Sequence, residues 1–143
     1  MQVDNWRIPE DLYYDWGDYW IKVTGNQAVI GMTEAGQSNI GDILYLDLVS
    51  EGTVVLRGEK VGSIESGKWV GSLKAPLSGV VVEVNRQLEE DPRQVNTDAY
   101  GQGWMFRMEL TDVGEISKLM DPRAYKAWTE EQMCLAKEGE MSS

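Results

Sequence analysis

The stretch IESGKWVGSLKAPLSG, residues 64–79, places a single lysine, Lys68, at a bend between two apolar segments. Val61–Ser66 leads into the bend, Leu73–Pro76 leads out of it, and Gly67 and Lys68 stand at the turn itself. A glycine beside a polar residue between two such runs is typical of a hairpin turn. The pattern therefore predicts a β-hairpin that holds the amine of Lys68 in solvent at its tip.

The segments on both sides of this hairpin predict a mostly β protein. Strands are expected at Trp20–Val23 and Gln27–Gly31, joined by a turn, and in the β-branched runs 42–49, 53–66, 72–85 and 103–110. Short strands at close spacing favour a sandwich or a barrel. The pattern strand–loop–strand occurs in 41–66 and again in 78–110, which suggests two similar halves packed face to face.

Two helices are expected beside the strands. Thr33 is a suitable N-cap and Gly41 a stop signal, so a short helix is predicted near 33–39. A C-terminal extension, about 112–137, changes to a helical period, and Asp121 followed by Pro122 predicts a helix over 121–137.

This C-terminal helix is expected to dock on the sandwich. Its packing stripe is predicted to consist of four residues at helical spacing: Tyr125, Trp128, Gln132 and Leu135. The only cysteine, Cys134, is interpreted as a small apolar packing residue of the same helix.

The composition narrows the function further. The 143 residues carry a formal net charge of −11, and they include no histidine. One domain, 1–143, is expected from this length. The negative charge argues against binding of nucleic acid or anionic lipid and favours partners with a basic docking face. No apolar run is long enough to span a bilayer and no secretory signal is recognisable, so a cytoplasmic protein is expected.

The sequence offers no arrangement of residues typical of an enzyme. Without histidine there is no Ser-His-Asp or Cys-His pair and no imidazole metal site. Acidic runs such as LEEDPR, 88–93, are interpreted as solvated polar loops, and YGQGW, 100–104, as turn residues. No glycine-rich phosphate-binding motif follows a strand. We therefore expect a protein that is not an enzyme and that holds no metal.

These exclusions return attention to Lys68. A lysine on a turn is usually a solvated surface residue. An exposed amine at the tip of a rigid strand pair is also what covalent attachment of a cofactor requires, because a modifying enzyme must reach it and the finished arm must move. Pro76 fixes the path of the strand that leaves the tip.

The motifs around Lys68 resemble the H-protein family, the lipoyl carriers of the glycine cleavage system. The family has a lead-in similar to ESVKA, a following APVSGEVVEVN and a later VN-x-DPYGEGW. Here the sequence reads ESGKW, APLSGVVVEVN and VNTDAYGQGW at matching spacings, and the upstream segments GDILYLDL and GTVVLRGEKVGSIES also match. The similarity extends without large gaps from about Tyr14 to Trp128.

The resemblance implies a fold, a cofactor and partners. The implied fold is the barrel-sandwich hybrid of lipoyl domains, with two antiparallel sheets, a short helix and a C-terminal helix. The implied cofactor is lipoate, amide-linked to Lys68 on an arm on the order of 10–15 Å long, which supplies thiol–disulfide chemistry while the protein supplies presentation. The implied partners are lipoylation enzymes, dihydrolipoamide dehydrogenase and the enzymes between which the arm moves.

Three alternatives to lipoylation of Lys68 follow from the residues. Lys74 is a weaker candidate for modification because it falls within the strand that leaves the hairpin. Biotin is disfavoured because biotinyl lysines usually lie between methionines, whereas Lys68 lies between Gly67 and Trp69. The third alternative is an unmodified interaction module, and the complete hairpin motif argues against it.

The sequence departs from the family pattern near the expected position of the arm. The family's HEWV is DYWI here, so Asp18 replaces a histidine. The family's TDYAQ is TEAGQ in this sequence, and Trp69 replaces the small residue that follows the lysine in the family. We expect Lys68, Gly67, Trp69, Glu65 and Asp18 to form the cofactor site, and Glu34 to border the resting place of the arm.

These departures bear on the pathway that the arm serves. They favour a carrier of sulfur-bound intermediates, as in the lipoate-binding proteins of the heterodisulfide-reductase-like system of sulfur oxidation. The alternative is the aminomethyl carrier of glycine cleavage.

Overall fold

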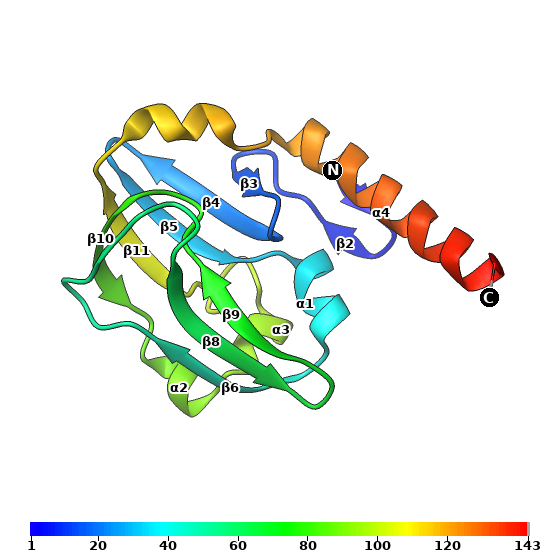
Figure 1. The fold of residues 1–143 in the computed structure, drawn as a ribbon, viewed down its shortest axis with the longest axis horizontal. Helices are drawn as coiled ribbons and strands as arrows, with labels where there is room; N and C mark the ends of the chain where they lie inside the picture. The colour runs from blue at the N-terminus through cyan, green and yellow to red at the C-terminus, as the bar shows by residue number, and fades with distance from the viewer. Residues whose placement is uncertain (143) are drawn as a thin grey trace.

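The computed structural model describes residues 1–142, with side chains described through Leu135. Its strands form three antiparallel sheets (Figure 1). The largest has the order β3 (Tyr13–Asp15), β4 (Tyr19–Thr24), β5 (Gln27–Met32), β11 (Phe106–Leu110), β10 (Gly79–Val84) and β7 (Val54–Val55). The second consists of β6 (Ile43–Leu48), β8 (Lys60–Ser66) and β9 (Val70–Lys74), and the third of β1 (Gln2–Val3) and β2 (Trp6–Arg7).

The main core lies between the six-stranded and the three-stranded sheet. Alternating residues of each strand point inward, so that Leu46, Ile64 and Leu73 of the smaller sheet share one buried cluster with Val81 and Met108 of the larger sheet. This arrangement confirms the expected mostly β sandwich of antiparallel sheets. The repeated strand–loop–strand pattern corresponds to two antiparallel pairs, β6 with β8 and β10 with β11, which lie in different sheets.

Two predicted strands are wrong because each run is divided between the two sheets. The run 53–66 contains β7 and β8, and a turn at Leu56–Glu59 separates them, where Gly58 adopts a φ of +91°. The run 72–85 contains β9 and β10, separated by the buried residues Ala75–Ser78. The residues Ala75–Ser78 are buried, so the apolar pattern of 72–85 continues through its crossing without a polar break. Leu56–Glu59 are exposed, and the polar residues Arg57 and Glu59 mark the crossing in 53–66.

The first helix has the predicted boundaries. α1 (Glu34–Ile40) begins after Thr33, whose hydroxyl oxygen accepts a hydrogen bond from the amide N–H of Gly36, and it ends at Gly41 with a φ of +86°. The acidic run 88–93, predicted as a loop, instead contains most of α2 (Gln87–Glu90), which buries Leu88. The next short helix, α3 (Gln94–Thr97), buries Val95 and was not predicted. The predicted strand 103–110 is shorter at its start, because β11 begins at Phe106.

A second buried cluster lies on the outer face of the large sheet. It joins the N-terminal segment to the C-terminal helix α4 (Pro122–Ser142), through Ile8, Leu12, Tyr14, Trp20 and Tyr125. Figure 1 shows α4 running past the N-terminal strands. A 3-10 helix, η1 (Val113–Lys118), precedes it.

The predicted stripe of α4 is correct only in its first half. Tyr125 is fully buried and Trp128 is partly buried, whereas Gln132, Leu135 and Cys134 are exposed. The interpretation of Cys134 as a packing residue is therefore wrong. The packed side of α4 instead continues through Thr129, which is buried, and Met133, which is partly buried against the second cluster, so Gln132 and Leu135 lie outside it.

None of the helices in the described part of the chain has the length and apolar character needed to cross a membrane.

Candidate functional site

The β8–β9 hairpin presents Lys68 at its tip. The turn is closed by a hydrogen bond of 2.8 Å from the amide N–H of Ser66 to the carbonyl oxygen of Trp69. Gly67 and Lys68 are the two residues between them, and both are exposed. This is the turn that the sequence predicted.

Ser66 fixes the hairpin tip to the end of α1. Its side chain is buried, and its hydroxyl donates a hydrogen bond of 2.7 Å to the carbonyl oxygen of Ile40. The same hydroxyl oxygen accepts a hydrogen bond of 3.3 Å from the amide N–H of Lys68. The tip is therefore bound to the body of the protein on one side, which restricts the direction in which Lys68 leaves the turn.

The side chain of Lys68 lies over Gly41, the residue that ends α1. Its Cε carbon is 3.1 Å from the position that a Cβ carbon on Gly41 would take. Any other residue at this position would meet the lysine and would also be strained, because the φ of Gly41 is +86°. Asn96 of α3 supports the same point, since its amide group donates to the carbonyl oxygen of Gly41 and to Gln37, and accepts from the amide N–H of Ile43.

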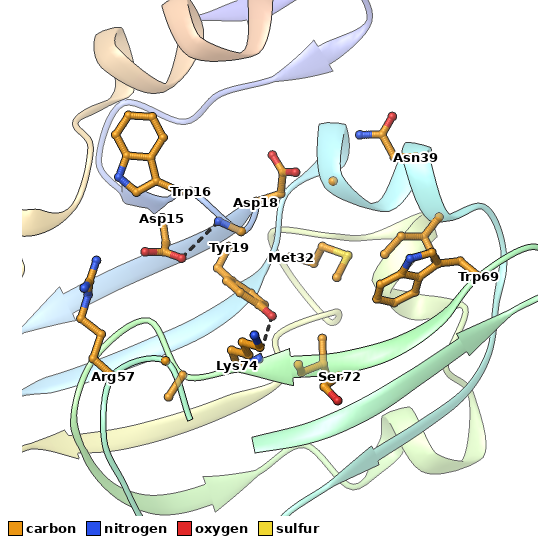
Figure 2. Close-up of a pocket in the computed structure, with 16 residues that line it drawn as sticks. Asp15, Trp16, Asp18, Tyr19, Met32, Asn39, Arg57, Trp69, Ser72 and Lys74 are labelled. Carbon is orange, nitrogen blue, oxygen red and sulfur yellow. Dashed lines mark hydrogen bonds between the residues drawn. The ribbon is translucent and has the colours of Figure 1, made fainter. Parts of the chain in front are cut away.

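A groove of about 770 Å³ opens next to the hairpin (Figure 2). It lies between the β3–β4 turn, the side of α1, and strand β9. The residues that border it include Asp15, Trp16, Asp18, Tyr19, Met32, Asn39, Ile40, Arg57, Trp69 and Lys74. Figure 2 shows Trp69 and Asn39 at one end and Trp16, Asp15 and Arg57 at the other.

Two cross-strand neighbours of the large sheet form the middle of the groove. Tyr19 of β4 pairs with Met32 of β5, and both line the cavity. The hydroxyl oxygen of Tyr19 accepts a hydrogen bond of 2.9 Å from the amide N–H of Lys74, which connects the large sheet to β9 across the groove. Burial raises the pKa of Tyr19, so its hydroxyl stays protonated at neutral pH. The groove thus combines an apolar wall with a small number of fixed polar groups.

Asp18 borders the groove from the β3–β4 turn. Its backbone has a φ of +65°, and its carboxylate oxygen Oδ1 accepts a hydrogen bond of 2.8 Å from the hydroxyl of Tyr125 in α4. Burial raises the pKa of Asp18 above its ordinary value, the hydrogen bond from Tyr125 opposes this, and the charge of Asp15 adds to the rise. Asp18 is thus a half-buried carboxylate connected to the C-terminal helix.

Trp69 lies at the end of the groove nearest to Lys68. Its side chain is 41% exposed, and its ring covers Gly71 so closely that a side chain at that position would have no room. An aromatic ring that is half in solvent, beside an exposed amine, provides an apolar surface without belonging to the core.

The other residues singled out in the sequence lie at different places. Lys74 is exposed and borders the groove, but it belongs to β9 and not to a turn. Glu34 does not border the groove, because its carboxylate binds the guanidinium and the amide N–H of Arg7. Glu65 is exposed on β8, beside Tyr45 and Val70 of the neighbouring strands.

Several residues of the site have little signal in the sequence. Ser66 could be found as the first residue of a β-turn, a position that favours serine. The sequence does not indicate that Tyr125 contacts Asp18, because more than a hundred residues separate the two. Its spacing predicts only a packing residue of a helix. Asn96 is similar, since its partners belong to α1 and β6.

Comparison with known proteins places this chain among proteins of one family. The profile of the family described as glycine cleavage H-protein matches residues 12–132. A glycine cleavage system H protein from Carboxydothermus hydrogenoformans is 41% identical over 87% of this chain and 96% of its own length. One from Bacillus subtilis is 43% identical over 87% and 98%. A mitochondrial H protein 2 from Arabidopsis thaliana is 42% identical over 87% and 80%.

A solved structure gives the same result. The crystal structure of a glycine cleavage system H protein from Mycobacterium marinum superposes with a TM-score of 0.78 at 34% identity, covering 86% of this chain and 99% of that one. The names of these relatives refer to glycine cleavage and not to sulfur oxidation, so the expected sulfur carrier gains no support from them. The match of the family profile, of full-length relatives and of the fold leads to one conclusion: this chain belongs to the glycine cleavage H-protein family.

Proposed function

We propose that this protein is a lipoyl carrier with lipoate amide-linked to Lys68, and that it transports the aminomethyl group between the enzymes of glycine cleavage. The observation that carries the proposal is the position of Lys68, which is exposed at the tip of a fixed hairpin and next to a groove. As a member of the H-protein family the chain is a carrier and not itself a catalyst.

The residues near Lys68 fit a lipoyl group. An amide-linked arm has no charge at the former amine, so it can lie on apolar surface without a desolvation cost for an ammonium. Trp69, Met32 and Ile40 provide such a surface along the groove. The volume of about 770 Å³ lies within the range of sites that bind small molecules.

The chain's own residues have separate tasks in this function. Ser66 and Gly41 hold the base of the arm in one place, and Trp69 with Met32 excludes water from one side of it. When bound, lipoate supplies the dithiol and disulfide chemistry that a chain with one cysteine does not provide. Attachment also keeps the reactive group at high effective concentration at each docked partner.

A second candidate is the carrier of sulfur-bound intermediates in a heterodisulfide-reductase-like system. The observation that favours it is the identity of two groove residues, Asp18 and Trp69, which depart from the pattern of glycine-cleavage H-proteins. The names of the relatives favour glycine cleavage, and we therefore place the aminomethyl carrier first.

The proposed partners are lipoylation enzymes, the glycine cleavage enzymes and dihydrolipoamide dehydrogenase. The net charge of −11 favours partners whose docking face is basic. Glu65 and Val70 are exposed on the two strands that lead to the tip, and Tyr45 is exposed beside Glu65 on β6, so these side chains lie near Lys68 on the surface that a modifying enzyme approaches. Glu65 and Gly67 are proposed as contacts of the lipoylation enzyme.

Intact mass tests the attachment site. After incubation with a competent lipoate ligase, the mass of the wild type should increase by one lipoyl group. Lys68→Arg should show no increase, and the matched control Lys74→Arg should show the full increase. An increase that survives in Lys68→Arg and is lost in Lys74→Arg would assign the cofactor to β9 and overturn the proposal.

Isotope exchange separates the two carrier functions. The lipoylated protein is incubated with glycine decarboxylase and labelled glycine, and the exchange of carbon dioxide is followed. Exchange at the rate of an authentic H-protein supports the aminomethyl carrier. Absence of exchange, together with sulfur adducts on the arm in a thiosulfate-oxidising host, supports the second candidate.

A further inference from the structure

A second pocket, of about 430 Å³, lies on the outer face of the large sheet. Trp20, Val29 and Trp104 supply much of its apolar lining, and all three belong to the second buried cluster or pack against it. Successive residues of a strand face opposite sides of a sheet, so Trp20 borders this pocket while Tyr19 borders the groove beside Lys68. The volume lies within the range of sites that bind small molecules.

Hydrogen bonds fix the aromatic walls of this pocket. The indole N–H of Trp20 donates to the carbonyl oxygen of Ala99 at 2.8 Å, so the indole presents only its apolar ring to the cavity. The buried side chain of Asn85 donates to the carbonyl oxygen of Trp104, also at 2.8 Å. A ligand therefore meets aromatic surfaces that are already in place and need little ordering on binding.

The N-terminal segment closes the pocket from another side. Pro9 and Asp11 border it, and both precede the part of the chain that the family profile matches, 12–132. The hydroxyl of Tyr14 donates to the carbonyl oxygen of Pro9 at 2.6 Å, which holds this segment against the sheet. Part of the pocket thus lies outside the region that the family match covers.

Two cations flank the floor of the pocket. Lys22 of β4 and Arg107 of β11 both lie opposite Val29 of β5 in the register of the sheet, and all three border the cavity. Lys22 takes part in no ion pair in the described part of the chain. Arg107 binds Glu83 through Nη2, but its Nε–H is buried and has no hydrogen-bond partner among the described residues. Buried donors are normally satisfied, so an acceptor is missing at this guanidinium.

The carboxylates at the rim do not cancel these cations. Glu83 is already paired with Arg107, and Asp11 is exposed, so water solvates it. A guanidinium has five N–H donors and can bind a second acceptor while it keeps the first. The pocket therefore offers an aromatic floor with free cationic donors, although the chain as a whole carries a net charge of −11.

We propose that this pocket binds a flat aromatic carboxylate. Its ring lies on the apolar floor beside Trp104 and Val29, and its carboxylate accepts from the Nε–H of Arg107 and from the ammonium of Lys22. Charge-assisted hydrogen bonds of this kind fix the orientation of the ligand, and the aromatic contact supplies the buried area. The proposal does not depend on the attachment of lipoate to Lys68.

The unmodified full-length protein is titrated with 2-naphthoate at pH 7 and followed by NMR. The indole N–H resonances of Trp20 and Trp104 and the amides of 100–104 should shift and saturate. 2-Naphthamide has the same ring without the charge, and it should bind about tenfold more weakly, the loss expected for a charge-assisted hydrogen bond. Equal affinity of the two probes, or no shift of these resonances at millimolar 2-naphthoate, would overturn the proposal.

Four surface variants assign the anion to the two cations. Lys22→Gln should weaken binding of 2-naphthoate about two- to fivefold, and Arg107→Gln about tenfold or more. Lys60→Gln is the control for an exposed strand lysine, and Arg86→Gln for an arginine that is paired with carboxylates elsewhere. Equal losses in the pocket variants and their controls would show an effect of net charge alone and would overturn the proposed contacts.

Val29→Phe tests the cavity itself. The larger side chain fills the floor between the two cations without removing either charge, so 2-naphthoate should no longer bind. The melting temperature shows whether this variant is folded. A folded Val29→Phe protein that binds 2-naphthoate as tightly as the wild type would overturn the proposal. If Val29→Phe does not fold, the two charge variants still decide it.

Discussion

The Cβ carbon of Asp18 lies 2.5 Å from the position that a Cβ carbon on Gly36 would take. This close approach joins the β3–β4 turn to the first turns of α1, two segments that together border the groove. The neighbouring backbone is also connected, since the amide N–H of Thr33 donates to the carbonyl oxygen of Asp18 at 2.9 Å. The shape of the groove therefore depends on the absence of a side chain at Gly36.

Gly36→Ala is expected to destabilise the protein by about 1–3 kcal/mol, as overpacking of a buried site does. The added methyl group meets the Cβ of Asp18, which cannot move without its backbone, and this cost exceeds the gain of about 1 kcal/mol in helix propensity. Thermal unfolding measures the change. Gly67→Ala is the control, because no atom lies within 4 Å of the added group. A Gly36→Ala variant as stable as the control would contradict the tight contact.

Asp18→Asn is expected to raise the stability at neutral pH. Burial raises the pKa of Asp18 in the folded protein above its ordinary value of about 3.9. Between these two pKa values the folded protein binds more protons than the unfolded chain. Stability is therefore lost as the pH rises through this window, and above it the ionised Asp18 costs stability. The variant lacks this loss, while its amide oxygen can still accept from Tyr125.

Denaturant unfolding of both proteins as a function of pH measures this difference. The advantage of Asp18→Asn should be present at pH 7 and should disappear below about pH 3.9. Asp47→Asn, which changes an exposed carboxylate of β6, is the matched control for loss of one negative charge. A variant that is less stable than the wild type at pH 7 would show that Asp18 is stabilised in its ionised form.

Trp69→Ala is expected to slow lipoyl transfer or partner turnover and to change the free energy of unfolding by less than about 1 kcal/mol. The ring is 41% exposed and packs on Gly71 at the surface, so its removal opens no cavity in the core. The rate of lipoylation and the melting temperature are measured in parallel. Val70→Ala, at a neighbouring residue that is 71% exposed, serves as the control. A large loss of stability would identify Trp69 as a core residue.

Asn96→Ala is expected to destabilise the protein by about 2–3 kcal/mol. The change removes three hydrogen bonds, and it leaves the amide N–H of Ile43 and the carbonyl oxygen of Gly41 without this partner. Because Asn96 holds the backbone of Gly41 and Ile43, its loss should also make hydrogen exchange of the amides around 41–43 faster. Asn26→Ala, at an exposed turn residue, should leave both measurements nearly unchanged.

The sequence by itself determined the local features of this protein. The hairpin around Lys68, the N-cap of Thr33, the end of α1 at Gly41 and the start of α4 depend on neighbouring residues and on their backbone preferences, and all are present in the structure. The family also follows from the order of the motifs, because their spacing is a property of the chain.

Only the tertiary structure decided which segments share a sheet and where the apolar surfaces end. The run 72–85 crosses between sheets without a polar break, because Ala75–Ser78 are buried. Gln132 and Leu135 of α4 are exposed although they continue the helical spacing, because the helix turns Thr129 and Met133 toward the second cluster instead. The connection of Tyr125 to Asp18 spans 107 residues, and no local preference encodes a contact between positions that only folding brings together.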